Sequence, residues 1–159
     1  LMLYGKIMVP YDGSEHAKHA LEYAKGLAAI SDAKIAIVHV VPSGVMGVDQ
    51  IGTEGSLDGV PFGMLNYEQY EGVVQAALDQ AKEKVTENLA GLVEDIADIV
   101  TIDVVAGTAP AEALARYADK NGCDLIVMGR RGLGAIRGML GSVSFGLLRS
   151  TDVPVLTVK

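Results

Sequence analysis

The stretch that decides the fold is Leu125-Ile-Val-Met-Gly-Arg-Arg-Gly132, which Gly141-Ser142 follows after an interval of eight residues. Its first four residues are apolar, which is typical of a strand buried on both faces of a sheet. The glycines then allow the backbone a positive φ and a close approach to a ligand. Because the exposed N–H groups of such a loop, and of a helix start after it, bind anions, this stretch predicts a phosphate site.

The charge of the same region is opposite to that of the chain. Residues 129–149 contain six glycines, four of the five arginines and no Asp or Glu, whereas the whole chain has a formal charge of −7. A solvated basic face is the alternative interpretation of these arginines. The reversal of sign beside a glycine loop favours a ligand that bears phosphates.

Composition sets the broad class of protein. With 159 residues, half of them hydrophobic, we expect residues 1–159 to form one domain with a well-buried core. The acidic balance argues against a general nucleic-acid or membrane surface. The single Cys123 excludes an intrachain disulfide and a Cys-based zinc site, and it suits a reducing compartment. No secretory signal and no apolar run of ~18 residues are present, so we expect a cytoplasmic protein that does not span a membrane.

Working outward from the glycine loop, strands and helices alternate along the chain. Expected strands occupy 6–10, 34–41, 100–106, 124–128 and 153–158. Expected helices occupy 15 to about 29, about 67 to 96, a segment capped by Thr108 that ends at Asn121-Gly122, and 143–149. This alternation predicts an open, parallel, five-stranded α/β sheet with helices on both faces.

The position of the ligand then fixes the strand order. In such sheets ligands bind outside the carboxyl ends of the strands, where the order reverses. Asp12 follows the first strand and the glycine loop follows the fourth. If one ligand touches both, these two strands must be neighbours, which favours the order 3-2-1-4-5 over the flavodoxin-like order 2-1-3-4-5.

The segment 42–66 is the least regular part of the sequence. It holds six glycines, three acidic residues and no Lys or Arg between an expected strand and an expected helix. A loop this long is unusual in a compact domain unless it is a lid, an interaction loop or disordered. We expect a flexible insertion at 42–66, with a gating role beside the ligand pocket as the alternative.

Several of these stretches together resemble the universal stress protein family in its ATP-binding branch. The resemblance rests on Leu125-Ile-Val-Met-Gly129-x-x-Gly132, Gly141-Ser142, Val153-Pro-Val-Leu, Lys6-Ile-Met-Val-Pro-Tyr-Asp12-Gly-Ser14, Val38-His39-Val40 and Ala106-Gly107. It implies a Rossmann-like fold of the adenine nucleotide alpha hydrolase type, ATP binding and a homodimer paired through Val153–Val158. ADP or AMP in place of ATP, and Mg²⁺ beside the phosphates, stay open.

The resemblance also implies a set of binding residues. They are Pro10, Tyr11, Asp12, Val41, Met128, Gly129, Arg131, Gly132, Gly141, Ser142, Val143 and Ser144. Asp12 is expected at the ribose or adenine edge, Val41 at the adenine through its backbone, and the residues from 129 onward at the phosphates. One departure concerns the interval between Gly132 and Gly141, which is eight residues here and nine in the usual pattern.

Simpler interpretations compete at several of these positions. Asp12 is also placed to cap the first helix with Glu15 as a box-like pair, and Ser142 is placed to act only as an N-cap. His16 and His19 lie three residues apart on a helix, but two histidines alone do not predict a metal site. His39, in an apolar strand, is expected to be a hydrogen-bonded core or edge histidine.

Two classes of function fit this site, a nucleotide-dependent binding module and an enzyme of phosphoryl transfer. The second needs a group that orients the nucleophile and usually a held metal ion, and residues 129–149 contain no carboxylate or Gln. A P-loop and a kinase signature are both missing from the sequence. We therefore expect an ATP-binding regulatory module of the stress response with no catalytic residues, and slow hydrolysis or phosphotransfer as the alternative. A flavin site is weaker, because the chain has no Trp and only two Phe.

Overall fold

The computed structural model describes residues 3–42, 56–57, 60–61, 66–132 and 140–159, and its centre is one parallel sheet. The strands are β1 (Lys6–Pro10), β2 (Lys34–Pro42), β5 (Val100–Gly107), β6 (Leu125–Gly129) and β7 (Val155–Val158). They are ordered β5-β2-β1-β6-β7, and each neighbouring pair is parallel. In chain order this is 3-2-1-4-5, so the predicted fold class and strand order are confirmed.

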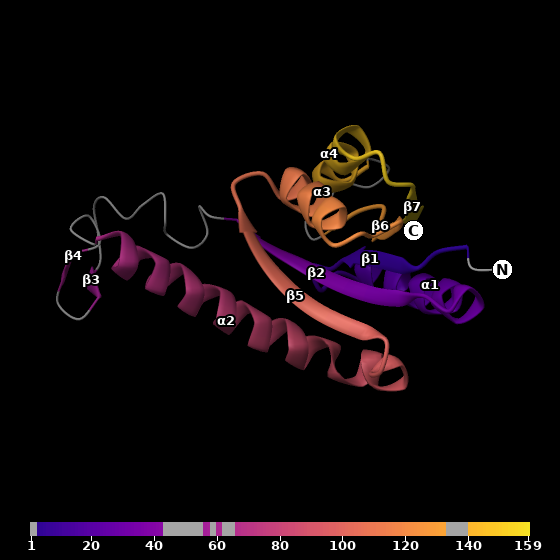
Figure 1. The fold of residues 1–159 in the computed structure, drawn as a ribbon, viewed down its shortest axis with the longest axis horizontal. Coiled ribbons are helices and arrows are strands. Elements are labelled where there is room, and N and C mark those ends of the chain that lie inside the picture. Colours follow the sequence, from indigo (N-terminus) through magenta and orange to yellow (C-terminus); the bar gives the residue numbers. More distant parts are fainter. Residues whose placement is uncertain (1–2, 43–55, 58–59, 62–65, 133–139) are drawn as a thin grey trace.

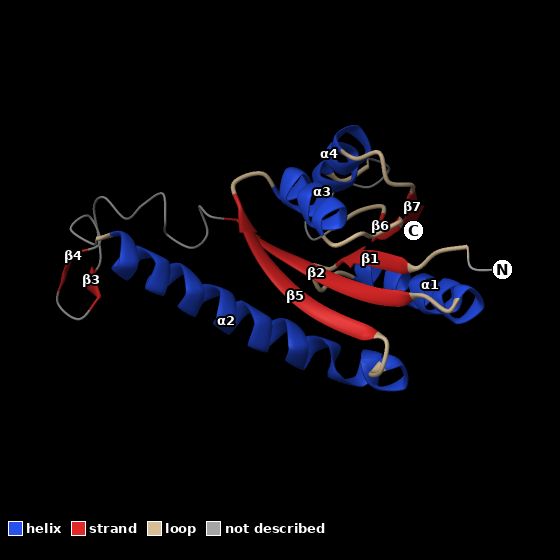
Figure 2. Cartoon of the chain, in the orientation of Figure 1, coloured by secondary structure: helices blue, strands red, loops and turns tan. Residues whose placement is uncertain are grey.

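Helices cover both faces of the sheet. One face carries α1 (Glu15–Ser31) and α2 (Tyr67–Val93), and a 3₁₀ turn at Glu94–Ile96 closes the second of these helices. The other face carries α3 (Pro110–Lys120) and α4 (Ser142–Ser150). Figure 1 shows α2 on one side of the strands and α3 with α4 on the opposite side. The N-terminal half of α2 extends well beyond the end of the sheet (Figure 2).

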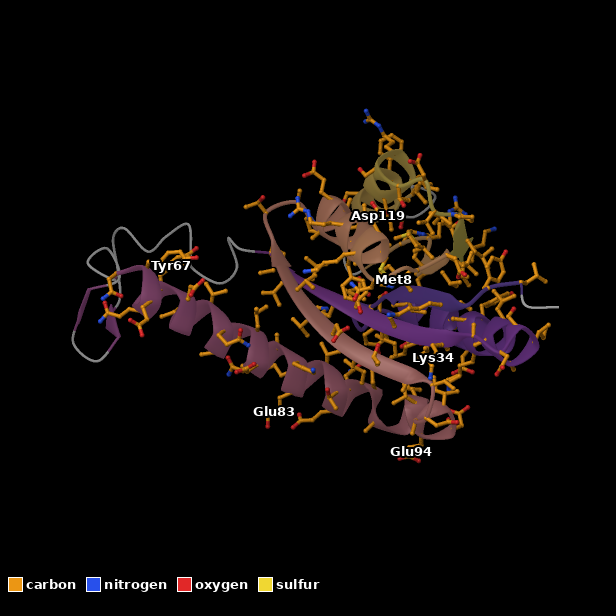
Figure 3. All side chains as sticks on the ribbon, viewed as in Figure 1. Met8, Lys34, Tyr67, Glu83, Glu94 and Asp119 are labelled. Carbon is orange, nitrogen blue, oxygen red and sulfur yellow. The ribbon has the colours of Figure 1, made fainter. Side chains whose placement is uncertain are left out.

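Each face of the sheet has its own hydrophobic core, because alternate residues of a strand point to opposite sides. On the α1 and α2 face, Ile7 and Val9 of β1 pack with Leu21 and Leu89. On the α3 and α4 face, Met8 packs with residues that include Leu114 and Leu147. Met8 lies between the sheet and the α3 layer (Figure 3). The central strands are buried on both faces, as their uninterrupted apolar sequences predict.

Local sequence accounts for where the helices begin. Ser14 caps α1 by accepting a hydrogen bond from the amide of Ala17, so this residue, and not Asp12, is the helix cap. Asn66 and Gln69 form a capping box at the start of α2. These caps satisfy amides that have no partner within the helix.

Several expected caps and boundaries differ from those in the structure. Thr108 does not cap α3, because Ala109 is the N-cap and makes no side-chain cap bond, while Pro110 is the first helical residue. Gly141 is the N-cap of α4, which makes Ser142 the first residue of the helix rather than its cap. The last strand begins at Val155 rather than 153. Caps depend on the exact turn that enters a helix, which residue type alone does not specify.

The expected insertion at 42–66 falls mostly outside the described residues. Within it, β3 (Ser56–Leu57) and β4 (Val60–Pro61) form a short antiparallel pair that the sequence interpretation did not include. Among the helices of the described ranges, none combines the length and apolar character needed to cross a membrane.

Candidate functional site

A cavity of about 520 Å³ lies at the carboxyl ends of β1, β2 and β6. Its lining consists of Pro10, Tyr11, Asp12, Ala17, Val38, His39, Val40, Pro42, Pro110, Leu114, Met128, Gly129, Arg131, Gly132, Leu140, Gly141, Ser142, Val143 and Ser144. In this strand order β1 is the point where the chain's direction of winding reverses. The cavity is therefore at the place where open α/β sheets bind ligands.

The structure brings the predicted site residues together with one exception. Val41 is not part of the lining, although its neighbours Val40 and Pro42 are. The sequence interpretation missed Pro110 and Leu114 of α3, which form part of the wall. Their only signal was indirect: α3 follows β5, so its first turn also lies at the carboxyl ends of the strands.

Asp12 and Gly132 touch across the cavity. A Cβ atom added to Gly132 would collide with Oδ2 of Asp12, so the carboxylate occupies the space that any side chain at position 132 would need. The other oxygen, Oδ1, accepts a hydrogen bond of 3.0 Å from the amide of Ser14. The acid that was expected at the nucleoside end thus lies directly beside the second glycine of the loop.

Gly129 allows β6 to approach α1. A Cβ atom at this position would lie 2.8 Å from both the carbonyl carbon and Cβ of His16, which are closer than van der Waals contact permits. The carbonyl of Gly129 accepts a hydrogen bond of 2.9 Å from the hydroxyl of Ser144. That hydroxyl, which was expected to donate to a ligand, is therefore already engaged, while α4 is fixed against the end of β6.

The peptide groups of Arg130 connect three elements. Its N–H donates to the carbonyl of Val158 in β7 at 2.6 Å, and its carbonyl accepts from the N–H of Gly141 at 3.0 Å. The beginning of the glycine loop is thereby joined both to the last strand and to the start of α4.

Arg131 supplies a positive charge to the cavity wall. The side chain is half-buried and its Nε is fully buried without a hydrogen-bond partner among the described residues. Leaving a charged donor buried and unpaired is costly. Because Nε is shielded from the cavity, an anion there would meet the positive charge of the guanidinium rather than this nitrogen. Asp12 carries the opposite charge within the same lining.

Tyr11 ties the cavity to α2. Its hydroxyl donates to Oδ1 of Asn88 at 2.5 Å, and its carbonyl accepts from Nδ1 of His39 at 2.8 Å. Because a carbonyl can only accept, this bond places a proton on Nδ1 of His39. Burial, followed by the charges of Asp12 and Glu15, raises the pKa of Tyr11. The phenol therefore stays protonated as a donor, and His39 is a hydrogen-bonded histidine as expected.

No group of three or more His, Cys, Asp or Glu side chains within the described ranges is arranged to hold a metal ion. Among the described residues, the polar groups that line the cavity belong to the glycine loop, the first turn of α4, Tyr11, His39, Arg131 and Asp12.

The fold and this cavity define the chain as a doubly wound α/β protein with a glycine-lined site at its switch point. More specifically, it belongs to the universal stress protein family, whose model matches residues 3–159.

Individual relatives agree with this assignment along the whole chain. Universal stress protein YxiE of Bacillus subtilis is 30% identical over 99% of this chain and 100% of its own. Universal stress protein MJ0577 of Methanocaldococcus jannaschii is 28% identical over 99% of this chain and 96% of its own. The solved structure of MJ0577 superposes with a TM-score of 0.72 at 26% identity, covering 100% of this chain and 97% of that one. A universal stress protein solved in complex with cAMP is 27% identical, with a TM-score of 0.56 over 98% of this chain and 96% of that one.

Proposed function

We propose that this protein binds an adenine nucleotide, ATP above all, in the cavity at the carboxyl ends of β1, β2 and β6. It acts as a nucleotide-dependent regulatory module of the stress response in the cytoplasm. The observation that carries the proposal is that Arg131, which bears a positive charge, lines the same cavity as the glycine loop and the first turn of α4. The cAMP complex of a related protein supports the choice of an adenine nucleotide.

The two ends of the cavity suit the two ends of a nucleotide. Val38, Val40, Leu114 and Met128 provide an apolar wall against which an adenine ring can pack. The glycine loop and the first turn of α4, a helix of nine residues, provide the amides that receive phosphates. Pro10, the last residue of β1, and Tyr11, which follows it, also line the cavity.

Mg²⁺ fits the same arrangement as a companion of the phosphates. Magnesium sites of nucleotide-binding proteins commonly use one or two carboxylates together with the phosphates themselves. Asp12, beside Gly132, is the carboxylate that would hold the ion. The ion would reduce the repulsion between this carboxylate and the phosphates.

The protein is proposed to act as a homodimer paired through β7. This strand ends the sheet and has a partner, β6, on one side only within the described ranges. A second copy would cover the open side and remove an edge that promotes aggregation.

Slow hydrolysis is the second candidate, and one observation favours it. Asp12 lies against the glycine loop, so a carboxylate is available near the phosphates after all. We nevertheless expect fewer than about one turnover per second, against typical enzyme rates of ~1–10³ per second. A metal-dependent rate typical of enzymes that disappears in Asp12→Asn would make the protein an enzyme.

Calorimetry with ATP and adenosine tests the binding proposal. Arg131→Ala should weaken ATP about ten- to 150-fold, the usual worth of one charge-assisted hydrogen bond, and should leave adenosine unchanged. Asp12→Ala should weaken both ligands alike if its role is at the ribose, or ATP alone if it holds Mg²⁺. Arg116→Ala, which removes an exposed arginine of α3, is the matched control and should alter neither affinity.

Gly132→Asp is a second variant for the phosphate end. It should weaken ATP more than adenosine, because its carboxylate blocks the close approach and repels phosphate. Its side chain would also displace Asp12. The affinity losses in Gly132→Asp should therefore be compared with those in Asp12→Ala. Equal losses for ATP and adenosine in both Arg131→Ala and Gly132→Asp would show that the phosphates lie elsewhere.

A further inference from the structure

We propose that nucleotide binding and the pairing of two copies through β7 strengthen each other, and that the peptide groups of Arg130 carry the coupling. The inference rests on the proposed function and adds its regulation: occupancy of the cavity sets the strength of the dimer.

The coupling begins with the contacts of the glycine loop. The N–H of Arg130 holds the carbonyl of Val158, the last residue of β7, while its carbonyl holds the N–H of Gly141 at the start of α4. The next residues, Arg131 and Gly132, line the cavity. A phosphate that fixes the loop therefore also fixes the residue that orients the end of β7.

The other side of β7 is complementary to a second copy of itself. The carbonyls of Pro154 and Val158 accept from the amides of Ile126 and Arg130, so these residues face β6. Because direction alternates along a strand, the N–H and C=O groups of Val155 and Thr157 face the open side. Antiparallel pairing about a twofold axis at Leu156 sets Val155 of each copy opposite Thr157 of the other, and every one of these groups finds a partner.

The side chains agree with such a twofold axis. Leu156 is exposed and would lie opposite its own copy, and Phe145 and Leu148 of α4 are large apolar residues that are also exposed. All three belong to the two elements that the peptide groups of Arg130 hold in place. A second copy is therefore the occupant that this edge fits.

Shared ordering explains why the two events should help each other. Both ATP binding and strand pairing require the segment around Arg130 and Val158 to hold one conformation. Whichever event comes first fixes that segment, so the second loses less conformational freedom. Linkage is reciprocal, so ATP must strengthen the dimer by the same factor by which dimerisation strengthens ATP binding.

The primary experiment uses the unmodified protein. Sedimentation measures the dissociation constant of the dimer without ligand, with saturating ATP and with saturating adenosine. We expect ATP to lower this constant about 5- to 150-fold, the usual range of allosteric coupling. Adenosine, which has no phosphate to hold the loop, should lower it much less.

Two variants of Arg130 test whether its backbone N–H carries the coupling between ATP binding and dimerisation. Arg130→Pro removes the N–H that bonds Val158, and Arg130→Ala removes the same side chain but keeps that N–H. In Arg130→Pro the dimer should no longer respond to ATP, whereas in Arg130→Ala the response should persist. Thermal unfolding checks that both variants fold. If Arg130→Pro does not fold, the measurement on the unmodified protein decides alone.

The possible outcomes distinguish a failure of the coupling from a failure of the proposed nucleotide binding. ATP binding with an unchanged dimer constant overturns the coupling and leaves nucleotide binding intact. A protein that binds ATP and stays monomeric overturns the coupling and the dimer together. Failure to bind ATP overturns both the proposed function and the coupling. If ATP changes the dissociation constant of the dimer equally in Arg130→Pro and Arg130→Ala, the N–H of Arg130 does not carry the coupling.

Discussion

β5 and β7 are both edge strands of the sheet, yet β5 has eight residues and an aspartate near its middle, whereas β7 has four residues and a leucine near its middle. Figure 1 shows β5 nearest the viewer with no described element in front of it, and β7 at the far side. By length alone, β5 offers a second copy more hydrogen bonds than β7 does.

The side chain at the twofold axis reverses that preference. The carbonyl of Ile99 accepts from Ile35 of β2, so alternation directs the backbone groups of residues 100, 102, 104 and 106 outward. The self-pairing that uses all of them centres on Asp103 and sets two carboxylates opposite each other, which is destabilising. Self-pairing of β7 sets Leu156 opposite Leu156 instead. Under the proposed pairing, a single residue type at the axis would thus separate an edge that repels its copy from one that accepts it.

The largest expected effect comes from removing an outward N–H on each edge in turn. Thr157→Pro should weaken the dimer about 5- to 150-fold, because two intermolecular hydrogen bonds, one from each copy, are lost at about 0.5–1.5 kcal/mol each. Ala106→Pro removes the corresponding N–H on β5 and should leave the dimer unchanged. Sedimentation over a dilution series measures both. Dissociation by Ala106→Pro, with Thr157→Pro unaffected, would move the interface to β5.

A smaller effect compares the glycines that end two of the strands. Gly129→Ala should destabilise the fold by about 1–3 kcal/mol, the usual cost of overpacking, since the new Cβ meets the backbone of α1 at 2.8 Å. At Gly107, at the end of β5, the new Cβ of Gly107→Ala meets the Cβ of Ala113 at 3.0 Å and the carbonyl oxygen of Ala109 at 3.8 Å, so this variant should cost less. Urea unfolding of the two variants gives both free energies. Equal losses of unfolding free energy would mean that the contact between β6 and α1 at Gly129 is no tighter than the contact at the end of β5.

The smallest expected effect is on the pH dependence of stability and involves Asp103, the aspartate of β5. Tyr117 of α3 donates a hydrogen bond to Oδ2 of Asp103. Burial first, and then this bond, raises the pKa of Tyr117 above its ordinary value of 10.0. A raised pKa in the folded state means that the contribution to stability is complete below pH 10.0 and is lost as the pH rises beyond it.

Tyr117→Phe tests this link. The variant should lose less stability than the unmodified protein between neutral and strongly alkaline pH, as measured by urea unfolding across that range. Tyr11, whose pKa is also raised, titrates in both proteins and cancels in the comparison. Parallel curves for the two proteins would show that burial and the bond to Asp103 do not raise the pKa of Tyr117.

Sequence patterns predicted the architecture because they act through burial. The apolar runs of β1, β2 and β6 fit only strands covered on both faces, and Asp12 and the glycine loop required β1 and β6 to be neighbours. The segment 42–66 and the effect of the shorter interval between Gly132 and Gly141 lie largely outside the described residues, so both remain expectations.

The details that sequence did not predict depend on contacts between distant parts of the chain. That Asp12 lies against Gly132, and that the hydroxyl of Ser144 donates to the carbonyl of Gly129, follow from how α1 and α4 meet the end of β6. Likewise, Val41 is absent from the cavity lining although both of its neighbours belong to it, which the apolar run of β2 gives no means to foresee.

Asp103 finally bears on the valence of the molecule. A sheet with two self-complementary edges would have a valence of two and could add copies without limit into a filament. If two copies pair through β7 as proposed, a carboxylate at the axis of the other edge would leave a valence of one, and growth would stop at two copies. Asp103 would then terminate assembly at two copies and so prevent the protein from forming filaments.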